Sequence, residues 1–258
     1  MSPAHSREFC PLTWLQVSMV LASRRAPRSG VYIIQDICKS AEELDSGLLQ
    51  RTWRQVAQRH AALRASVETA ANGDPHLKIH EDPDFHWQEL DWTQIAGHQA
   101  EEKLAAFLRE DRERGFAFSE GIPMRFTLLR MPENCQTLVW TCHHALLDGW
   151  SLLVVWREWF ELYDARRRGD EALLPDSGDF RDHLKGIEQQ DTVAAERFWR
   201  EQLAGLSQTT DYVVDRLRLD SEVPREDFAK ESRTLPEDAT HEVRSFARRH
   251  DVSVNNLI

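Results

Sequence analysis

The stretch TCHHALLDGWS, residues 141–151, joins two segments of very different character. The segment before it, QTLVWTCHH (136–144), is largely apolar up to its histidines, which is typical of a strand in the middle of a sheet. The segment after it, WSLLVVWREWFELYDARRRGD (150–170), has apolar residues at helical spacing and a basic last turn that suits the negative end of a helix dipole. The sequence therefore predicts that the two histidines lie in a loop between a central strand and a long helix.

Outward from this stretch, strand patterns and helix patterns alternate along the chain. The turn NGDP (72–75) predicts that two of the strands form a hairpin. Strands are expected at 31–38, 63–69, 76–81, 86–92, 124–131, 136–144, 211–219 and 229–235. Helices are expected at 11–22 with Pro11 in the first turn, at 40–60 with a Ser40 cap, and at 100–116, 150–170, 180–191, 194–206 and 236–250, and the last residues, DVSVNNLI, read as the opening of another helix. This alternation predicts a layered α/β domain.

Length and charge limit the class of protein. With 258 residues, the chain is long enough for one large domain, or for one domain and part of another. Its formal net charge of -11 disfavours binding to nucleic acid or to anionic membrane surfaces, because both attract positive fields. No segment approaches the roughly 20 consecutive apolar residues that span a bilayer, and the amino terminus lacks the pattern of a signal peptide. A cytoplasmic location with no membrane partner is expected.

The four cysteines, at positions 10, 38, 135 and 142, are scattered and form no CxxC pair. The spacing suggests neither a zinc site nor a disulfide framework, so buried free thiols are expected. Cys142 stands next to His143, which raises the possibility of a cysteine nucleophile. Because neighbouring strand residues point to opposite faces, packing of Cys142 in the core is the favoured interpretation.

The candidate site consists of His143, His144, Asp148 and Gly149. A histidine accepts a proton near neutral pH, and a loop at the end of a central strand exposes it at the rim of a rigid sheet. The Asp148 carboxylate can return across the loop to fix it or to pair with a cation, and Gly149 supplies a backbone geometry that a residue with a Cβ resists. In the structural alternative, Asp148 only caps the next helix and Gly149 is only a turn residue. Four such residues within seven favour a functional site.

HHALLDG (143–149), followed by WS, resembles the signature HHxxxDG of the condensation domains of nonribosomal peptide synthetases. Further segments are similar to the family in the same order along the chain. They are PLTWLQVSM (11–19), with Trp14 where a Pro is common; RHAALRASV (59–67), similar to RHxxLRTxF with Ala65 and Val67 in place of Thr and Phe; FRDHLKGIEQQD (180–191) followed by ERFWREQLAGL (196–206); and ARRHDVSVNNLI (247–258).

The resemblance implies a two-layer α/β sandwich similar to chloramphenicol acetyltransferase, with a mixed sheet in the amino-terminal lobe. In the family, two such lobes form a pseudodimer, and the histidine loop lies on a tunnel between them. We expect the amino-terminal lobe at 1–175, and connecting helices with an incomplete start of the second lobe at 176–258. The chain is therefore expected to be truncated, which leaves open whether it is active alone.

The activity implied by the resemblance is amide formation. The α-amine of an acceptor aminoacyl thioester attacks a donor acyl or peptidyl thioester. Phosphopantetheine arms of donor and acceptor peptidyl carrier proteins deliver both thioesters, and an adenylation domain is an expected neighbour. The resemblance assigns His144 as the positioning group or general base, His143 as a residue that shapes the loop, and Gly149 as backbone near the reacting centre, and it places Asp148 in a salt bridge with Arg64. No metal and no directly bound cofactor or nucleotide is expected, since the chain has no Walker or Rossmann glycine pattern.

Two other functions stay open. A related acyltransferase would move an acyl group from coenzyme A or a carrier with only the HxxxDG part of the motif, and the matches at RHAALRASV and ERFWREQL argue against it. A condensation-like module without activity would only dock proteins to an assembly line. Such modules usually lose the histidines, whereas His143 and His144 are both present.

Overall fold

The computed structural model describes residues 9–70, 73–207 and 233–257. By its contacts the chain divides into two units, 1–210 and 211–258, and each is described by itself. This division does not test the lobe boundary predicted at 175, which stays a prediction. The strand expected at 211–219, and most of the one expected at 229–235, lie outside the described residues.

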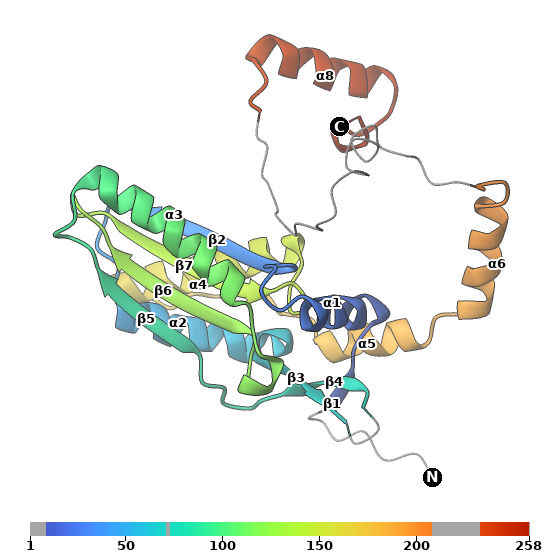
Figure 1. Cartoon of the computed structure of the whole chain (residues 1–258), viewed down its shortest axis with the longest axis horizontal. Helices are drawn as coiled ribbons and strands as arrows, with labels where there is room; N and C mark the ends of the chain where they lie inside the picture. Colours follow the sequence, from blue (N-terminus) through green and yellow to red (C-terminus); the bar gives the residue numbers. More distant parts are fainter. Residues whose placement is uncertain (1–8, 71–72, 208–232, 258) are drawn as a thin grey trace, which may run out of the picture. The chain divides into compact units, whose positions relative to one another are not determined.

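The histidines belong to a mixed sheet of four strands in the first unit (Figure 1). The strands, in spatial order, are β2 (Ile33–Ser40), β7 (Gln136–His143), β6 (Met124–Arg130) and β5 (His86–Asp91). β7 pairs antiparallel with both β2 and β6, and β5 runs parallel to β6. The prediction that the apolar segment 136–144 is a central strand is confirmed.

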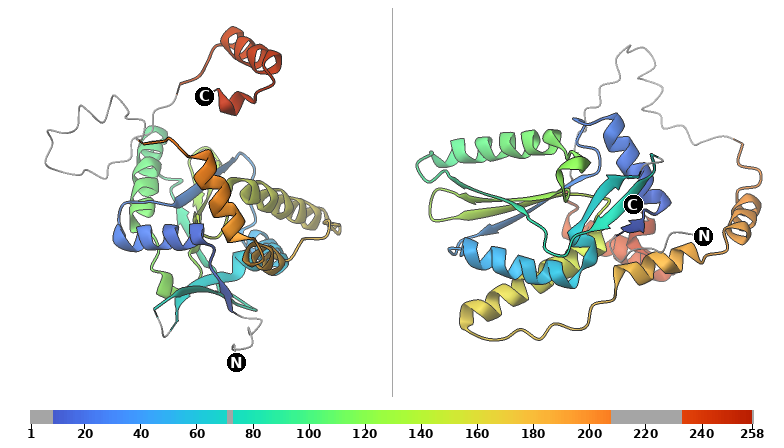
Figure 2. Two further views of the ribbon diagram at one scale, coloured as in Figure 1. Left: turned by 90° about the vertical axis from the view of Figure 1, so that its right-hand side faces the viewer. Right: turned by 90° about the horizontal axis from the view of Figure 1, so that it is seen from below.

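Helices cover both faces of this sheet (Figure 2, right). The helices α2 (Ser46–Arg59) and α4 (Gly149–Arg168) pack on one face, and α3 (Gly97–Arg114) packs on the other. The alternation along β7 explains this, since Trp140 and Cys142 join the core under α2 and α4, while Val139 joins the smaller core under α3. Both faces of β7 are therefore apolar, as its sequence indicates.

Aromatic rings fix α2 and α4 to the sheet. The ring of Trp53 in α2 lies 4.7 Å from that of Phe126, 5.0 Å from that of Trp140 and 4.8 Å from that of Trp159, measured between centroids. All four side chains are fully buried. Such edge-to-face pairs contribute about 0.5–1.5 kcal/mol each beyond the area they bury. The middle of β7 and the middle of α4 are thus held by a rigid core.

A second sheet of three strands lies beside the end of β7 at which the histidines stand. Its order is β1 (Phe9–Pro11), β4 (Pro75–Ile79) and β3 (Ala65–Thr69). β3 and β4 form the hairpin predicted from NGDP. The remaining elements of the first unit are α1 (Trp14–Arg25), α5 (Phe180–Glu188), α6 (Thr192–Gln202) and the 3-10 turns η1 (Ala61–Arg64) and η2 (Phe118–Glu120).

Two helices begin later than predicted. α1 starts at Trp14 with Thr13 as its cap, because Pro11 still belongs to β1. α2 starts at Ser46 with Asp45 as its cap, because β2 continues through Ser40. In both cases the residue at which local propensity starts the helix, Pro11 or Ser40, belongs to a strand instead.

In the second unit, α8 (Glu237–Arg249) confirms the helix predicted at 236–250. The chain then forms a 3-10 turn, η3 (Val254–Asn256), where the opening of another helix was expected. Among the residues described, no helix has the length and apolar character needed to cross a membrane.

Candidate active site

The HHxxxDG loop, residues 143–149, connects the end of β7 to the start of α4. Asp148 is the cap of α4, and its Oδ1 accepts a hydrogen bond from the backbone N–H of Ser151 at 2.8 Å. Hydrogen bonds from Ser151 hold the pKa of the Asp148 carboxyl below its ordinary value. A charged carboxylate also suits the positive end of the helix dipole. Asp148 therefore takes the capping role of the structural alternative.

His143 is buried and is held by the protein on both ring nitrogens. The backbone N–H of Ala145 donates to Nδ1 at 3.0 Å, so the proton of the neutral ring is on Nε2, which lies 2.8 Å from the Oγ of Ser23. Burial, with a smaller effect from His144, lowers the pKa of His143 to about 4. The ring is therefore neutral at pH 7 and has no nitrogen left for a substrate.

His144 faces a cavity instead. Its backbone N–H donates to the carbonyl of Tyr32 at 2.8 Å, which fixes the chain at this point. Tyr32 has a left-handed φ of 57°, an uncommon conformation for a bulky residue that points to a local constraint. The Nδ1 of His144 has no hydrogen-bond partner among the described residues. Of the two histidines, only His144 lines the cavity, whereas both ring nitrogens of His143 are already bonded within the protein.

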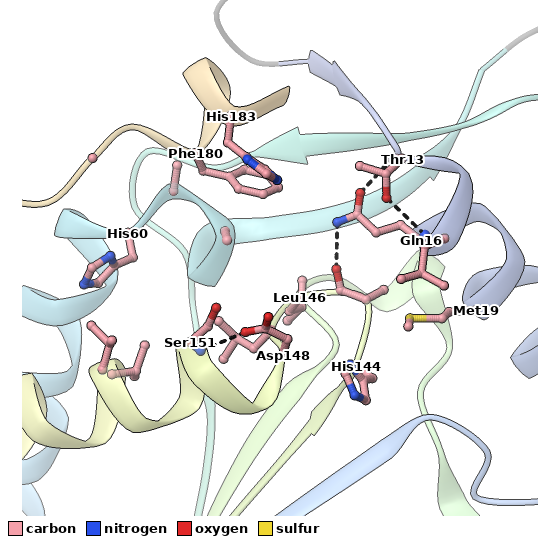
Figure 3. A pocket seen from close by; sticks show the side chains of 18 of the residues that line it. Thr13, Gln16, Met19, His60, His144, Leu146, Asp148, Ser151, Phe180 and His183 are labelled. Carbon is pink, nitrogen blue, oxygen red and sulfur yellow. Dashed lines mark hydrogen bonds between the residues drawn. The ribbon is translucent and has the colours of Figure 1, made fainter. Parts of the chain in front are cut away.

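The cavity has a volume of about 600 Å³, which is in the range of pockets that hold small ligands. Its wall comes from α1, the HHxxxDG loop, the first turns of α4, η1 and the start of α5 (Figure 3). Apolar side chains such as Met19, Leu147 and Phe180 form much of the wall, and His60 and His183 add polar groups. The cavity can hold an extended molecule with a few polar atoms.

Gln16 is a site residue that the sequence reasoning missed. Its Nε2 donates to the carbonyl of Ala145 at 2.9 Å, and its Oε1 accepts from the backbone N–H of Thr13 at 2.9 Å. The hydroxyl of Thr13 accepts in turn from the backbone N–H of Gln16 at 3.2 Å. The pattern Thr-x-x-Gln is a capping box and could have located the start of α1, but nothing local indicates the bond to the loop.

The predicted ion pair between Arg64 and Asp148 is wrong. The guanidinium of Arg64 donates from Nε to the carbonyl of Ala57 at 2.9 Å and from Nη1 to that of His80 at 2.5 Å. Burial, followed by the nearby charge of Arg181, lowers the pKa of Arg64. Because Arg64 stands in η1, its side chain binds the end of α2 and the residue after β4, and it supports the packing there.

The special backbone geometry predicted for Gly149 is also wrong. A Cβ built on Gly149 would meet no atom within 4 Å, and Gly149 is not among the glycines with positive φ. It is the first residue of α4, where many residues fit. Whether it presents its backbone to a reacting centre stays a prediction.

Cys142 packs in the core, as expected. Burial raises the pKa of its thiol far above the ordinary value, which excludes a thiolate nucleophile. Cys10 is buried and Cys38 half-buried, but the expectation of burial is wrong for Cys135, which is exposed. Nowhere in residues 9–70, 73–207 or 233–257 do three His, Cys, Asp or Glu side chains gather as metal ligands would.

Sequence comparisons find the same family along almost the entire chain. The family model described as the condensation domain matches residues 6–258. The chain is 32% identical over 252 residues to a linear gramicidin synthase protein of Brevibacillus parabrevis, covering 96% of this chain and 3% of that protein. It is 30% identical over 251 residues to bacitracin synthase 3 of Bacillus licheniformis, covering 96% of this chain and 4% of that protein. The chain thus spans only a small part of the length of these relatives.

Solved structures share the fold. The first condensation domain of the calcium-dependent antibiotic synthetase superposes with a TM-score of 0.73 at 18% identity, covering 97% of this chain and 59% of that one. The starter condensation domain of rhizomide synthetase in complex with C8-CoA gives a TM-score of 0.68 at 21% identity, covering 76% of this chain and 46% of that one. The predicted fold class is confirmed. With its HHxxxDG loop, its architecture and a family match over residues 6–258, the chain belongs to the condensation domain family.

Proposed function

We propose that this chain provides the histidine loop of a condensation domain that forms an amide between two carrier-bound thioesters. The nitrogen of the acceptor's α-amine attacks the carbonyl carbon of the donor thioester. The new N–C bond forms, the C–S bond breaks, and the proton lost by the amine ends on the departing thiol sulfur. The products are a lengthened acyl chain on the acceptor and a free thiol on the donor arm.

The observation that carries the proposal is the contrast between the two histidines. His143 is fully engaged by Ala145 and Ser23, whereas His144 lines the cavity, and its buried Nδ1 has no partner among the described residues. A neutral imidazole at this place can accept a hydrogen bond from the attacking amine, orient it, and receive its proton. We assign His144 as the general base or positioning group, and His143 and Asp148 as residues that hold the loop.

The cavity supports the proposed partners. A volume of about 600 Å³ with mixed apolar and polar walls suits a thioester and part of the arm that carries it. We propose that the phosphopantetheine arms of donor and acceptor peptidyl carrier proteins deliver these thioesters, and that an adjacent adenylation domain loads one of the carriers. His144, Met19 and Phe180 line the cavity and would contact a bound thioester.

The test uses the full-length protein in which the chain occurs, with a donor acyl group and an acceptor amino acid loaded on their carrier proteins. Product is measured by mass spectrometry for the parent protein, for His144→Ala and for His98→Ala, a control because His98 is exposed on α3. We expect His144→Ala to lower the rate of amide formation roughly a hundredfold or more, and His98→Ala to leave it unchanged. Amide formation by His144→Ala at the parent rate would instead support the docking function.

An acyl-CoA donor is the second candidate, since a domain of similar fold is solved with C8-CoA. The same assay separates the two, because it can be run with acyl-CoA in place of the acyl carrier protein. Faster product formation from the carrier-bound donor supports the assembly-line function, and equal or faster formation from acyl-CoA supports the acyltransferase.

A further inference from the structure

We infer that α1 positions His144 through two of its polar side chains, Gln16 and Ser23, which makes both of them positioning residues for the proposed reaction. Gln16 binds the carbonyl of Ala145, directly after His144. Ser23 binds the ring of His143, directly before it. This inference rests on the function proposed above and adds to it a part of the machinery that lies outside the HHxxxDG loop.

The need for such support follows from His144 itself. In the described part of the chain, its Nδ1 makes no hydrogen bond, so no donor or acceptor fixes that edge of the ring. The direction of the ring then depends on its backbone and on packing. The chain is held at three successive residues: Ser23 binds the ring of His143, Tyr32 accepts from the backbone N–H of His144, and Gln16 donates to the backbone carbonyl of Ala145.

The geometry of α1 places its two contacts on one face. Positions 16 and 23 are separated by about two helical turns, so both side chains point the same way. Met19 and Val20, which lie between them in the sequence, are the buried residues of the helix, and Met19 also lines the cavity. Figure 3 shows the amide of Gln16 between Thr13 and the loop, beside the wall that includes His144. The buried side of α1 thus contacts the loop through Gln16 near the start of the helix and through Ser23 near its end.

The bond from Gln16 also couples the loop to the start of the helix. Its Oε1 accepts from the N–H of Thr13 while its Nε2 donates to Ala145, so the same amide closes the capping box and holds the loop. A displacement of a catalytic group by about 1 Å can lower a rate by roughly a hundredfold. A defect in this amide should therefore affect the chemical step more than the binding of either thioester.

Gln16→Glu separates the two tasks of this side chain. A carboxylate still accepts from the N–H of Thr13 and is the usual partner in a capping box, so the helix start is preserved. It cannot donate to the carbonyl of Ala145, so only the bond to the loop is lost. The matched control is Gln58→Glu, because Nε2 of Gln58 also donates to a backbone carbonyl, that of Glu81 at 2.7 Å, away from the loop.

In the full-length protein with both carriers loaded, we expect Gln16→Glu to lower kcat roughly tenfold, with KM for each loaded carrier within about twofold of the parent value. Values are compared at a pH where kcat of each protein has reached its plateau, so that the added charge is not the cause. Gln16→Leu, which adds no charge, should lower kcat at least as much, and Gln58→Glu should leave kcat unchanged. A Gln16→Glu protein with the parent kcat would overturn the inference.

Hydrogen exchange gives a second measurement that does not depend on activity. Backbone amides of residues 141–148 should exchange several times faster in Gln16→Glu than in the parent, and Gln58→Glu should match the parent. Unchanged exchange in the loop would contradict the inference even if no amide product is formed. A parent protein without product, but with the expected change in exchange, would refute the proposed function while leaving the contact of α1 with the loop in place.

Discussion

Glu158 of α4 binds both residues that begin the segment RHAALRASV. Its Oε2 accepts from Nε of Arg59 at 3.0 Å and from Nε2 of His60 at 2.8 Å. Burial alone would raise the pKa of this carboxyl, but the hydrogen bonds from Arg59 and His60 outweigh it and the pKa lies below its ordinary value. Because His60 also lines the cavity, this contact joins the wall of the candidate site to the middle of α4.

We therefore predict that Glu158→Gln destabilises the protein by about 2 kcal/mol, since it leaves the half-buried guanidinium of Arg59 without its charged partner. Urea unfolding at pH 7 measures the change. Glu161→Gln on the same helix is the control, because its pair with Arg157 is exposed and long at 3.9 Å. The pKa of Glu158 is lowered by folding, so its contribution is present at neutral pH and is lost as the pH falls through the folded pKa. An equal effect of both variants would count against this contact.

The burial of His143 predicts a dependence of stability on pH. Its pKa falls from an ordinary 6.5 to about 4, so the unfolded chain binds more protons than the folded one between these values. Stability therefore rises with pH across this interval, and acidification from pH 6.5 to 4 should cost up to about 3 kcal/mol through this residue. Comparing unfolding of the parent and of His143→Gln at several pH values isolates the effect from that of the carboxylates. The difference in free energy between the two proteins should shrink as the pH falls; a constant difference would show that folding does not lower the pKa of His143.

Much of the fold could be predicted from local patterns. The apolar run of β7, the turn at 72–75 and the basic end of α4 each depend on neighbours in the sequence, and each was placed correctly. The start of α2 is not predicted correctly, because Ser40 and Asp45 are both residues that favour a helix N-cap. The pairing of β2 with β7 through Ser40 decides between them, and that pairing is a long-range property.

In the candidate site, too, features set by the local sequence could be predicted and features set by long-range contacts could not. The placement of His143 and His144 at the end of a strand follows from the local sequence. The partner of Arg64 does not follow from the local sequence. A long side chain can reach several carbonyls or carboxylates, and elements far along the chain decide which of them lies within reach. Gln16 was missed for the same reason, since the carbonyl it binds belongs to Ala145, 129 positions away.

The separation of Arg64 from Asp148 can be tested by a double-mutant cycle. Asp148→Ala removes the cap of α4 and should cost about 1 kcal/mol, whereas Asp148→Ser keeps a capping hydroxyl and should cost less. Arg64→Met removes the bonds to the carbonyls of Ala57 and His80. Because the two side chains share no partner, their effects on the free energy of unfolding should add within about 0.5 kcal/mol. A coupling energy above about 1 kcal/mol would instead support an ion pair between Arg64 and Asp148.

A single carboxylate connects α3 to three strands of the main sheet. Asp111 accepts from Nε of Arg125 in β6 at 2.5 Å, from the hydroxyl of Thr141 in β7 at 2.6 Å and from Nε2 of Gln35 in β2 at 2.8 Å. Burial would raise the pKa of Asp111, but these hydrogen bonds, led by that of Arg125, bring it below the ordinary value. The contact with Thr141 lies two residues before His143, so Asp111 also steadies the strand that carries the histidines.

Asp111→Asn should therefore destabilise the protein by about 3–5 kcal/mol, because the guanidinium of Arg125 stays buried without a counter-charge. Glu110→Gln is the control, since Glu110 is the exposed neighbour on the same helix and its loss should change little. Replacing Arg125 as well, in Asp111→Asn with Arg125→Met, removes the unpaired charge and should recover part of the stability. Urea unfolding of the three variants at pH 7 measures these differences. If the double variant were no more stable than Asp111→Asn, the cost would come from lost packing of α3 and not from the buried charge.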